Sequence, residues 1–139
     1  MPRSPLPREL EVFLSEPNPA VIATLHSDGR PHTAATWYLW ERGRVLVNMD
    51  ERRERLEHLR RDPRVSITVL GADGWHRHIT LEGNVVSLTP DREFEGIDQL
   101  ARHYTGAPFG TRDRGRVNAW IEVVSWHAWA GTGPWNAAG

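Results

Sequence analysis

Cysteine and lysine are both absent from the chain. Without cysteine, the protein has no disulfide, no thiolate metal ligand and no cysteine nucleophile. Without lysine, all 17 basic side chains are arginine, which favours planar, bidentate contacts with phosphate or carboxylate groups. A compositional bias of the source genome explains that total more simply than function does. The clustering of arginines in one segment needs an explanation of its own.

Long apolar runs are also missing. No apolar run approaches about 20 residues, so we expect no membrane-spanning segment. Residues 1–5 lack the apolar stretch of a signal peptide, and we expect a cytoplasmic location by default. The net charge of -1 disfavours a general nucleic-acid binder.

The chain length suits one compact domain, which we expect to span residues 1–139. With a mean hydropathy of -0.54, a monomer of this size buries only a modest core, which favours dimerisation. Seven tryptophans supply large, rigid apolar area that suits pockets and interfaces.

Turn signals and alternating apolar residues predict a mainly β chain with flanking helices. We expect helices over residues 7–16, about 52–62 and 91–104, and strands over 20–25, 32–40, 45–48, 65–70, 75–88 and 117–124. Short hairpin turns at 27–30, 42–43 and 72–74 favour an antiparallel sheet over alternating βαβ units. Six strands with few edges predict a small barrel with helices packed outside it.

Single residues mark several expected boundaries. Asp50 is a good N-cap for the second helix, and Pro63 marks its end. Pro90 suits the first turn of the third helix. Gly83, inside the long strand 75–88, indicates a bulge or a close approach of another backbone.

Six arginines lie within residues 52–64, the segment of the second helix. A helix N-terminus beside arginine is a natural phosphate site. On a helical wheel Leu56 and Leu59 define the buried side. Arg52 projects close to that side, and Arg55 borders it.

The alternative is a solvated helix face with ion pairs between neighbouring turns. That interpretation suits Glu57 with Arg61, which point away from the buried side. It suits Arg52 and Arg55 less well, because they do not lie on the outermost face. The residues alone leave both interpretations open.

The strand over residues 32–40 is the second candidate site. Small hydroxyl side chains interleaved with one aromatic suit a flat ring that lies against the backbone. A barrel strand with small inward residues is the alternative. Alternation places His32, Ala34, Thr36 and Tyr38 on one face and Thr33, Ala35 and Trp37 on the other.

Histidines are the third candidate. His76 and His78 share a strand face, but no carboxylate lies at ligand spacing near them, so we expect no metal site. His26, His103 and His127 are isolated in the sequence. No Ser-His-Asp arrangement or paired carboxylates can be argued from spacing, so we assign no catalytic side chain.

Several segments together are similar to a known family. They are residues 20–25 with 28–32, Thr36-Trp37-Tyr38, residues 48–65 and Leu81-Glu82-Gly83. In order and spacing they resemble the pyridoxamine-phosphate-oxidase-like (PPOX class) split-barrel flavoproteins. More narrowly, they are similar to the actinobacterial branch of deazaflavin (coenzyme F-420) dependent oxidoreductases. The resemblance covers residues 6–129.

The resemblance implies a homodimer of six-stranded antiparallel split β-barrels of the FMN-binding type, with cofactor sites at the dimer interface. Arg53 and Arg55 match the basic pair that holds the cofactor phosphate in that family. The strand that matches residues 32–37 lines the ring, and the segment of Asn48 and Met49 follows it toward the phosphate. The tail over 126–129 matches, loosely, a segment that closes the site from the second subunit.

Three positions depart from the family pattern. Arg55 stands where lysine is common, Arg52 where a small residue is usual, and His58 where asparagine is usual. Arg52 and His58 either favour a more highly charged cofactor or are surface variation. The expected cofactor-binding residues are His32, Thr33, Thr36, Trp37, Asn48, Met49, Arg52, Arg53, Arg55 and His58.

By this resemblance the protein moves a hydride from reduced coenzyme F-420 to a conjugated small molecule such as a quinone, an enone or a tetrapyrrole. One alternative keeps the fold and uses FMN as cofactor, in an oxidase or reductase. Another is a non-enzymatic carrier or sensor of a flavin or deazaflavin. A nucleic-acid contact through residues 52–64 is disfavoured by the acidic residues in and beside that segment.

Overall fold

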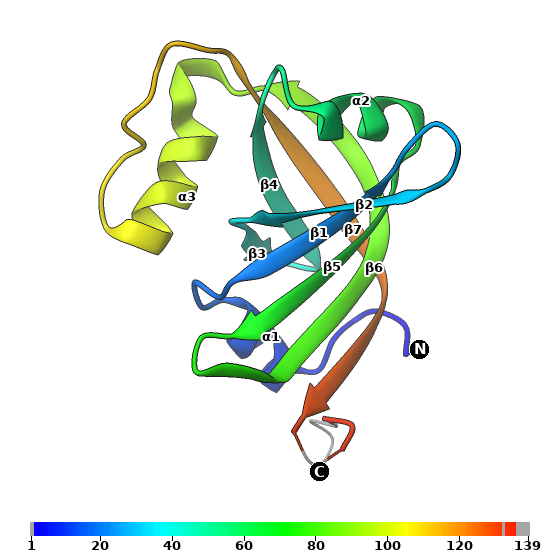
Figure 1. Cartoon of the computed structure of the whole chain (residues 1–139). Coiled ribbons are helices and arrows are strands. Elements are labelled where there is room, and N and C mark those ends of the chain that lie inside the picture. The colour runs from blue at the N-terminus through cyan, green and yellow to red at the C-terminus, as the bar shows by residue number, and fades with distance from the viewer. Residues whose placement is uncertain (1, 132, 136–139) are drawn as a thin grey trace.

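The computed structural model describes residues 2–131 and 133–135. Seven strands form one antiparallel sheet in the order β2-β1-β5-β6-β7-β4-β3. The sheet is strongly twisted, and the three helices lie outside it (Figure 1). In chain order the elements are α1 (Arg8–Leu14), β1 (Ala20–Leu25), β2 (Pro31–Thr36), β3 (Leu39–Glu41), β4 (Arg44–Asp50), α2 (Glu54–Arg61), β5 (Arg64–Gly71), β6 (Gly74–Pro90), the 3-10 turn η1 (Arg92–Phe94), α3 (Glu95–Thr105) and β7 (Arg116–Ala130).

The sheet curls on itself without closing. Its two edge strands, β2 and β3, are consecutive in the chain and are joined by two residues, yet they pair with opposite ends of the sheet. The two-residue link keeps the ends of β2 and β3 that it connects close together. The two strands are not paired by backbone hydrogen bonds, so the barrel stays open between them. The expected split barrel of antiparallel strands is confirmed, and its opening lies at the link between β2 and β3.

The strand expected over residues 32–40 is two strands, which makes seven strands rather than six. The break occurs because Tyr38 turns into the core and is fully buried. Its hydroxyl donates to the Leu14 carbonyl oxygen at 2.8 Å, and its backbone N–H donates to the Tyr104 hydroxyl at 3.3 Å. These tertiary contacts replace the ladder hydrogen bonds at that point.

Helices α1 and α2 lie toward opposite ends of the barrel (Figure 1). Leu10, Phe13 and Leu14 of α1 and Leu56 and Leu59 of α2 are buried in the main core. The predicted buried side of α2 is therefore confirmed. Alternating side chains of β5 and the inward side chains of β7 fill the space between the helices.

Helix α2 begins later than the sequence suggested. Arg53 is the residue before its first turn, and no side chain caps it. Asp50 instead closes the preceding turn, because its carboxylate accepts the Arg52 N–H at 2.8 Å and its carbonyl accepts the Arg53 N–H at 3.0 Å. The expected Asp50 N-cap is wrong, and Arg52 lies outside the helix and is exposed.

The third helix also differs at its start. Pro90 ends β6, and η1 precedes α3, so Pro90 is not in the first helical turn. Asp91 nevertheless caps the helix: its two carboxylate oxygens accept the Gly96 N–H at 2.8 Å and the Ile97 N–H at 2.9 Å. Helix α3 is thereby fixed to the end of β6.

The last strand is longer than predicted. The tail over residues 126–129 continues β7 and pairs with β6, with Leu81 opposite Trp126. Trp126 is 7% exposed and belongs to the core of its own chain. The expectation that this part of the tail closes a site on another subunit is wrong for Trp126.

Gly83 lies at a shift of the β6–β7 register, as its position in the strand predicted. A Cβ atom there would clash with the Glu122 carbonyl oxygen, so only glycine permits this approach. None of the helices in the described residues is long and apolar enough to cross a membrane.

Candidate cofactor site

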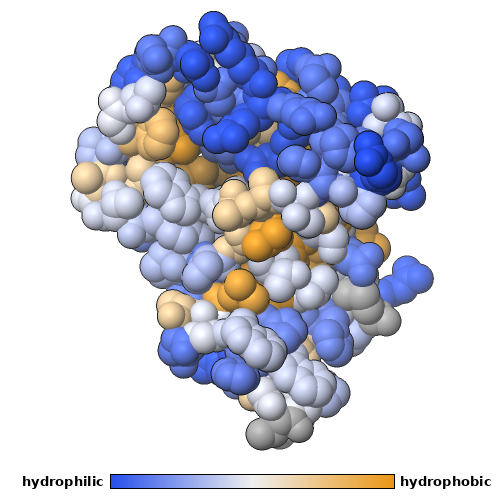
Figure 2. All heavy atoms as spheres, viewed as in Figure 1, coloured by the Kyte–Doolittle hydropathy of each residue, from blue (hydrophilic) through white to orange (hydrophobic). Residues whose placement is uncertain are grey.

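A groove of about 260 Å³ opens where β2, β4, α2 and α3 approach one another. We call it the main groove. It is lined by Ala35, Thr36, Trp37, Asn48, Met49, Arg53, Arg55, Ile97, Leu100, Phe109 and Arg116. A side pocket of about 220 Å³ shares Ala35, Arg53 and Arg55 with it and adds His32, Ala34 and Glu54. On the face seen in Figure 2, hydrophilic residues cover the end of the molecule that carries α2, and apolar residues show beside α3 and lower on the sheet.

Arg55 is the most unusual side chain of the main groove. It lies in the first turn of α2 and is only 9% exposed. Its Nε has no hydrogen-bond partner among the described residues. Burial, and then the charges of Arg53 and Arg116, lower the pKa of the Arg55 guanidinium to about 10. A buried charge without a partner is costly, so this position suits an anion that is bound from outside.

Arg116 reaches the same groove from the start of β7. Its Nε donates to Asn48 Oδ1 at 2.7 Å, and its guanidinium lies 4.9 Å from the centre of the Phe109 ring. The Asn48 amide in turn donates to Asp91 at 2.9 Å and to Asn118 at 2.8 Å. Both amide hydrogens of Asn48 are therefore used within the protein. Asn48 positions Arg116, and burial lowers the pKa of Arg116.

Trp37 forms the aromatic wall of the groove. Its ring stacks on Tyr104 of α3, with centroids 5.4 Å apart and planes 13° apart. Phe109 meets it edge-on at 6.3 Å. The Thr36 hydroxyl donates to the Trp37 carbonyl oxygen at 2.8 Å, which restrains the link before β3. Met49, on β4, also lines the groove and is almost fully buried.

Most of the predicted cofactor-binding residues lie together. The main groove contains Thr36, Trp37, Asn48, Met49, Arg53 and Arg55, and the side pocket contains His32. Thr33 is exposed on β2, and Arg52 is exposed in the turn before α2; neither lines either cavity. His58 is 2% exposed and bonds Thr24 at 2.9 Å, so it is not surface variation.

Several groove residues escaped the sequence analysis. Arg116 comes opposite Asp50 only through the pairing of β4 with β7. Phe109 lines the groove from the loop after α3, and Tyr104, at the end of α3, supports it by stacking on Trp37; both are far from β2 in the chain. One signal in the sequence was usable, namely Asp91 as the cap of the third helix. Its carboxylate also accepts a hydrogen bond from Asn48, and Asn48 in turn accepts one from Arg116.

The histidines were also misjudged. His26 is not isolated: its ring centre lies 4.5 Å from that of His58 and 5.4 Å from that of His32. These three residues lie far apart in the sequence, and the packing of α2 over β1 brings them together.

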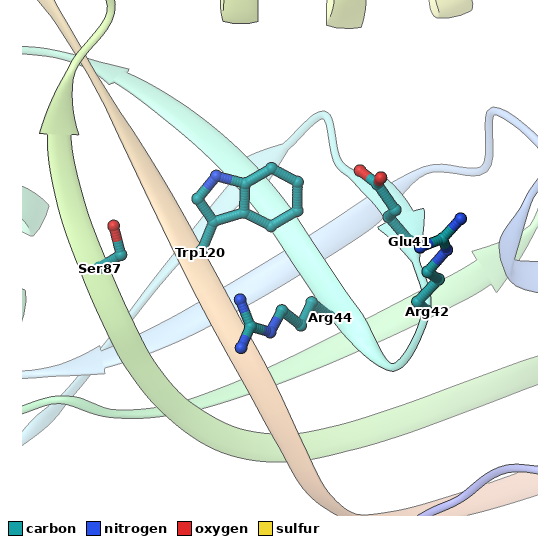
Figure 3. Close-up of a pocket in the computed structure, with 5 residues that line it drawn as sticks. All are labelled: Glu41, Arg42, Arg44, Ser87 and Trp120. Carbon is teal, nitrogen blue, oxygen red and sulfur yellow. The ribbon is translucent and has the colours of Figure 1, made fainter.

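A larger cavity of about 370 Å³ lies elsewhere, on β4, β6 and β7 and the β3–β4 turn (Figure 3). It is lined by Glu41, Arg42, Arg44, Ser87 and Trp120. Arg44 there lies 3.9 Å from Glu122, and both side chains are more than half exposed. No described side chain in this cavity is a buried, unpartnered charge. The main groove is therefore the better candidate for a charged cofactor.

A family model described as pyridoxamine 5′-phosphate oxidase matches residues 6–130, nearly the whole chain. The chain belongs to the pyridoxamine 5′-phosphate oxidase family. Members of this family bind flavins or related cofactors, and the family relationship places the chain among flavin- or deazaflavin-related oxidoreductases.

Solved structures support the fold of this family member. An F420 reductase superposes with a TM-score of 0.80 at 22% identity, covering 87% of this chain and 98% of that chain. A conserved hypothetical protein from Mycobacterium tuberculosis has a TM-score of 0.72 at 24% identity, covering 91% and 86%. The General Stress Protein 26 from Bacillus anthracis has a TM-score of 0.66 at 16% identity, covering 88% and 92%. At these levels of sequence identity, the similarity establishes a shared fold and nothing more.

Proposed function

We propose that the protein is an oxidoreductase that uses reduced deazaflavin (coenzyme F-420) to transfer a hydride to a conjugated organic substrate. The observation that carries the proposal is Arg55, a buried guanidinium whose Nε lacks a partner, beside Arg53 and Arg116. Three arginines around one groove suit the phosphate of a cofactor. The F420 reductase among the similar structures is consistent with the choice of deazaflavin.

The groove fits the two ends of such a cofactor. Arg53, Arg55 and Arg116 would hold its phosphate, and the wall made by Trp37 and Met49 would lie along its ring. Reduced deazaflavin supplies the hydride when it is bound, and the protein's part is to bind, orient and shield it. The stacking of Trp37 on Tyr104 keeps the aromatic wall rigid for that purpose.

The proton that accompanies the hydride is assigned to water. No described residue that lines the main groove carries a carboxylic acid or an imidazole. His32 lines only the side pocket, away from Trp37 and Met49. Substrates that need no strong acid therefore fit best, namely planar unsaturated compounds such as quinones and enones.

FMN is the alternative cofactor, because the same three arginines suit its phosphate group. Arg52 favours the deazaflavin, since its exposed guanidinium precedes Arg53 and is available to the acidic tail of that cofactor. Titration of the purified apo-protein with each cofactor, followed by fluorescence, separates the two. We expect deazaflavin to bind more tightly; tight FMN binding without deazaflavin binding would sink this choice.

A carrier or sensor would bind the cofactor without turning it over. The open groove and its lack of an acid are compatible with that alternative. We expect reduced deazaflavin to be oxidised by members of a panel of quinones and enones, at rates proportional to protein concentration. Binding without oxidation above background would favour the carrier.

We also propose that the protein is a homodimer with the cofactor sites at its interface. The main groove, at about 260 Å³, is smaller than the ~300–1,000 Å³ typical of pockets that enclose a ligand. A second copy of the chain is the partner that would complete it.

A further inference from the structure

Three histidines and one glutamate meet beneath α2, outside the main groove. His26 follows β1, His32 lies near the start of β2, and Glu54 and His58 lie one turn apart on α2. The ring centres of His26 and His58 are 4.5 Å apart, and His32 packs edge-on against both. Among the described residues, no other part of the fold brings three imidazole rings into contact.

The ligand atoms of this cluster converge. Glu54 Oε1 lies 3.6 Å from His26 Nδ1 and 3.6 Å from His58 Nε2. One ligand atom from each of the three residues lies within 4.8 Å of those from the other two. In a tetrahedral zinc site with bonds of about 2.0–2.2 Å, neighbouring ligand atoms are roughly 3.3–3.6 Å apart. Small side-chain adjustments therefore suffice to bring the three atoms onto one ion.

The second nitrogen of His58 is already held. Its Nδ1 lies 2.9 Å from the Thr24 hydroxyl, a buried partner on β1. When Nδ1 donates its proton to Thr24, Nε2 presents its lone pair toward Glu54. Metal-ligating histidines usually have such a partner, which fixes the tautomer and the orientation of the ring.

We propose that His26, Glu54 and His58 bind a divalent transition-metal ion, foremost zinc, with water in the fourth position. Two imidazoles and one carboxylate are a ligand set that zinc accepts readily. The bound ion would join the β1–β2 hairpin to α2. Because α2 carries Arg55, the ion would also stiffen the helix that lines the main groove.

The site rests on its own residues and does not depend on the proposed redox function. It was not foreseen from the sequence, because only Glu54 and His58 lie at a helical spacing and His26 is distant in the chain. The competing explanation is a cluster of ion pairs that holds no metal. It predicts that added zinc does not bind specifically to these residues.

Zinc titration of chelator-treated, untagged protein by calorimetry tests the proposal. We expect one zinc ion per chain and a rise in the melting temperature on zinc addition. Glu54→Gln and His26→Ala should each weaken zinc binding by about tenfold or more. Both side chains are partly exposed, 66% and 28%, so both variants should fold. Glu57→Gln and His76→Ala are the matched controls and should bind zinc like the wild type.

The second test uses the buried hydroxyl. Thr24→Val removes the partner of His58 and should weaken zinc binding by about ten- to a hundredfold, whereas Thr24→Ser keeps the hydroxyl and should restore it. The proposal is overturned if zinc does not bind saturably. It is equally overturned if the two ligand variants bind zinc as well as their controls, or if Thr24→Val binds it as well as Thr24→Ser.

Discussion

Arg55 is the residue on which the candidate cofactor site depends most. Its charge is buried at the first turn of α2, and its Nε has no partner among the residues that the structure describes. In the apo-protein such a charge lowers stability, because desolvation is not offset by a counter-charge. The arrangement is reasonable for a binding residue, since the ligand supplies the missing partner.

A stability measurement checks this directly. Arg55→Met keeps an unbranched apolar side chain, shorter than that of arginine, and removes the charge. We expect the apo-variant to be more stable than the wild type by about 1 kcal/mol or more, and to bind the cofactor less well. Urea unfolding gives the first quantity and a fluorescence titration the second. An apo-variant that is less stable than the wild type would contradict an unpaired Arg55.

At this scale the sequence analysis named Arg53 and Arg55, which both line the main groove, but it wrongly placed Arg52 within the helix. The wheel assumed that the helix includes Arg52, whereas it begins at Glu54. Arg116 was not foreseen because its place depends on strand pairing, which a local pattern does not specify. Buried histidines such as His58 are likewise positioned by tertiary packing.

Elements α3 and β7 together position the network behind the groove. Gly96, in the first turn of α3, packs against the Asn118 side chain so closely that a Cβ atom would clash with its amide oxygen. Asn118 accepts a hydrogen bond from Asn48, which holds Arg116. The glycine therefore sets the distance between the helix and the strand.

Gly96→Ala should displace Asn118 and disturb this network. We expect a loss of about 1–3 kcal/mol in unfolding free energy, even though alanine is the better helix former. Gly110→Ala is the matched control, because a Cβ atom there meets nothing within 4 Å. Urea unfolding of both variants is the measurement. Equal stabilities would show that α3 and β7 are not in close contact there.

The loop between α3 and β7 is held by Asp98. Its carboxylate accepts the Phe109 N–H at 3.0 Å and pairs with Arg112 at 2.7 Å. The Arg112 side chain, and then the Phe109 N–H, hold the pKa of Asp98 below the usual 3.8. Because the pKa is lowered by folding, Asp98 stabilises the protein above pH 3.8, and this contribution is lost as the pH falls through the lowered pKa.

Asp98→Asn should remove that part of the acid sensitivity. We expect the stability of the wild type to fall more steeply than that of the variant as the pH drops from about 4.5 to 2.5. Unfolding midpoints measured across this range provide the comparison, with Asp113→Asn in the same loop as control. Identical slopes in wild type and Asp98→Asn would contradict the pairing with Arg112.

Among the elements, those with strong local signals were predicted well. Strand β1 has the predicted bounds, and α1 and β5 lie within two residues of theirs at each end. The errors occurred where contacts between residues far apart in the sequence determine the bounds of an element. Tyr38 interrupts the strand expected over 32–40, and pairing with β6 extends β7 through the tryptophan-rich tail.

As a whole, the molecule is a split barrel whose candidate site lies beside the opening between its edge strands. The three-hairpin pattern was sufficient to predict an antiparallel barrel-like sheet. It was not sufficient to show where the barrel opens, because that depends on the two residues between β2 and β3. The main groove beside this link is open on the single chain.

The proposed dimer follows from that open groove. Light scattering coupled to size-exclusion chromatography should give twice the 15.8 kDa of one chain. Dilution into the monomer range should lower cofactor affinity, because half of each site would then be missing. A monomer that binds the cofactor with undiminished affinity would refute the interface location.

The arginine groove as a cofactor-phosphate site is the central claim, and titration of arginine variants with deazaflavin tests it most directly. Arg53→Ala and Arg55→Ala should each weaken binding by about 1.5–3 kcal/mol, the range for hydrogen bonds to charged groups. Arg61→Ala, on the exposed side of α2, should bind like the wild type. Wild-type affinity in both groove variants would contradict the claim.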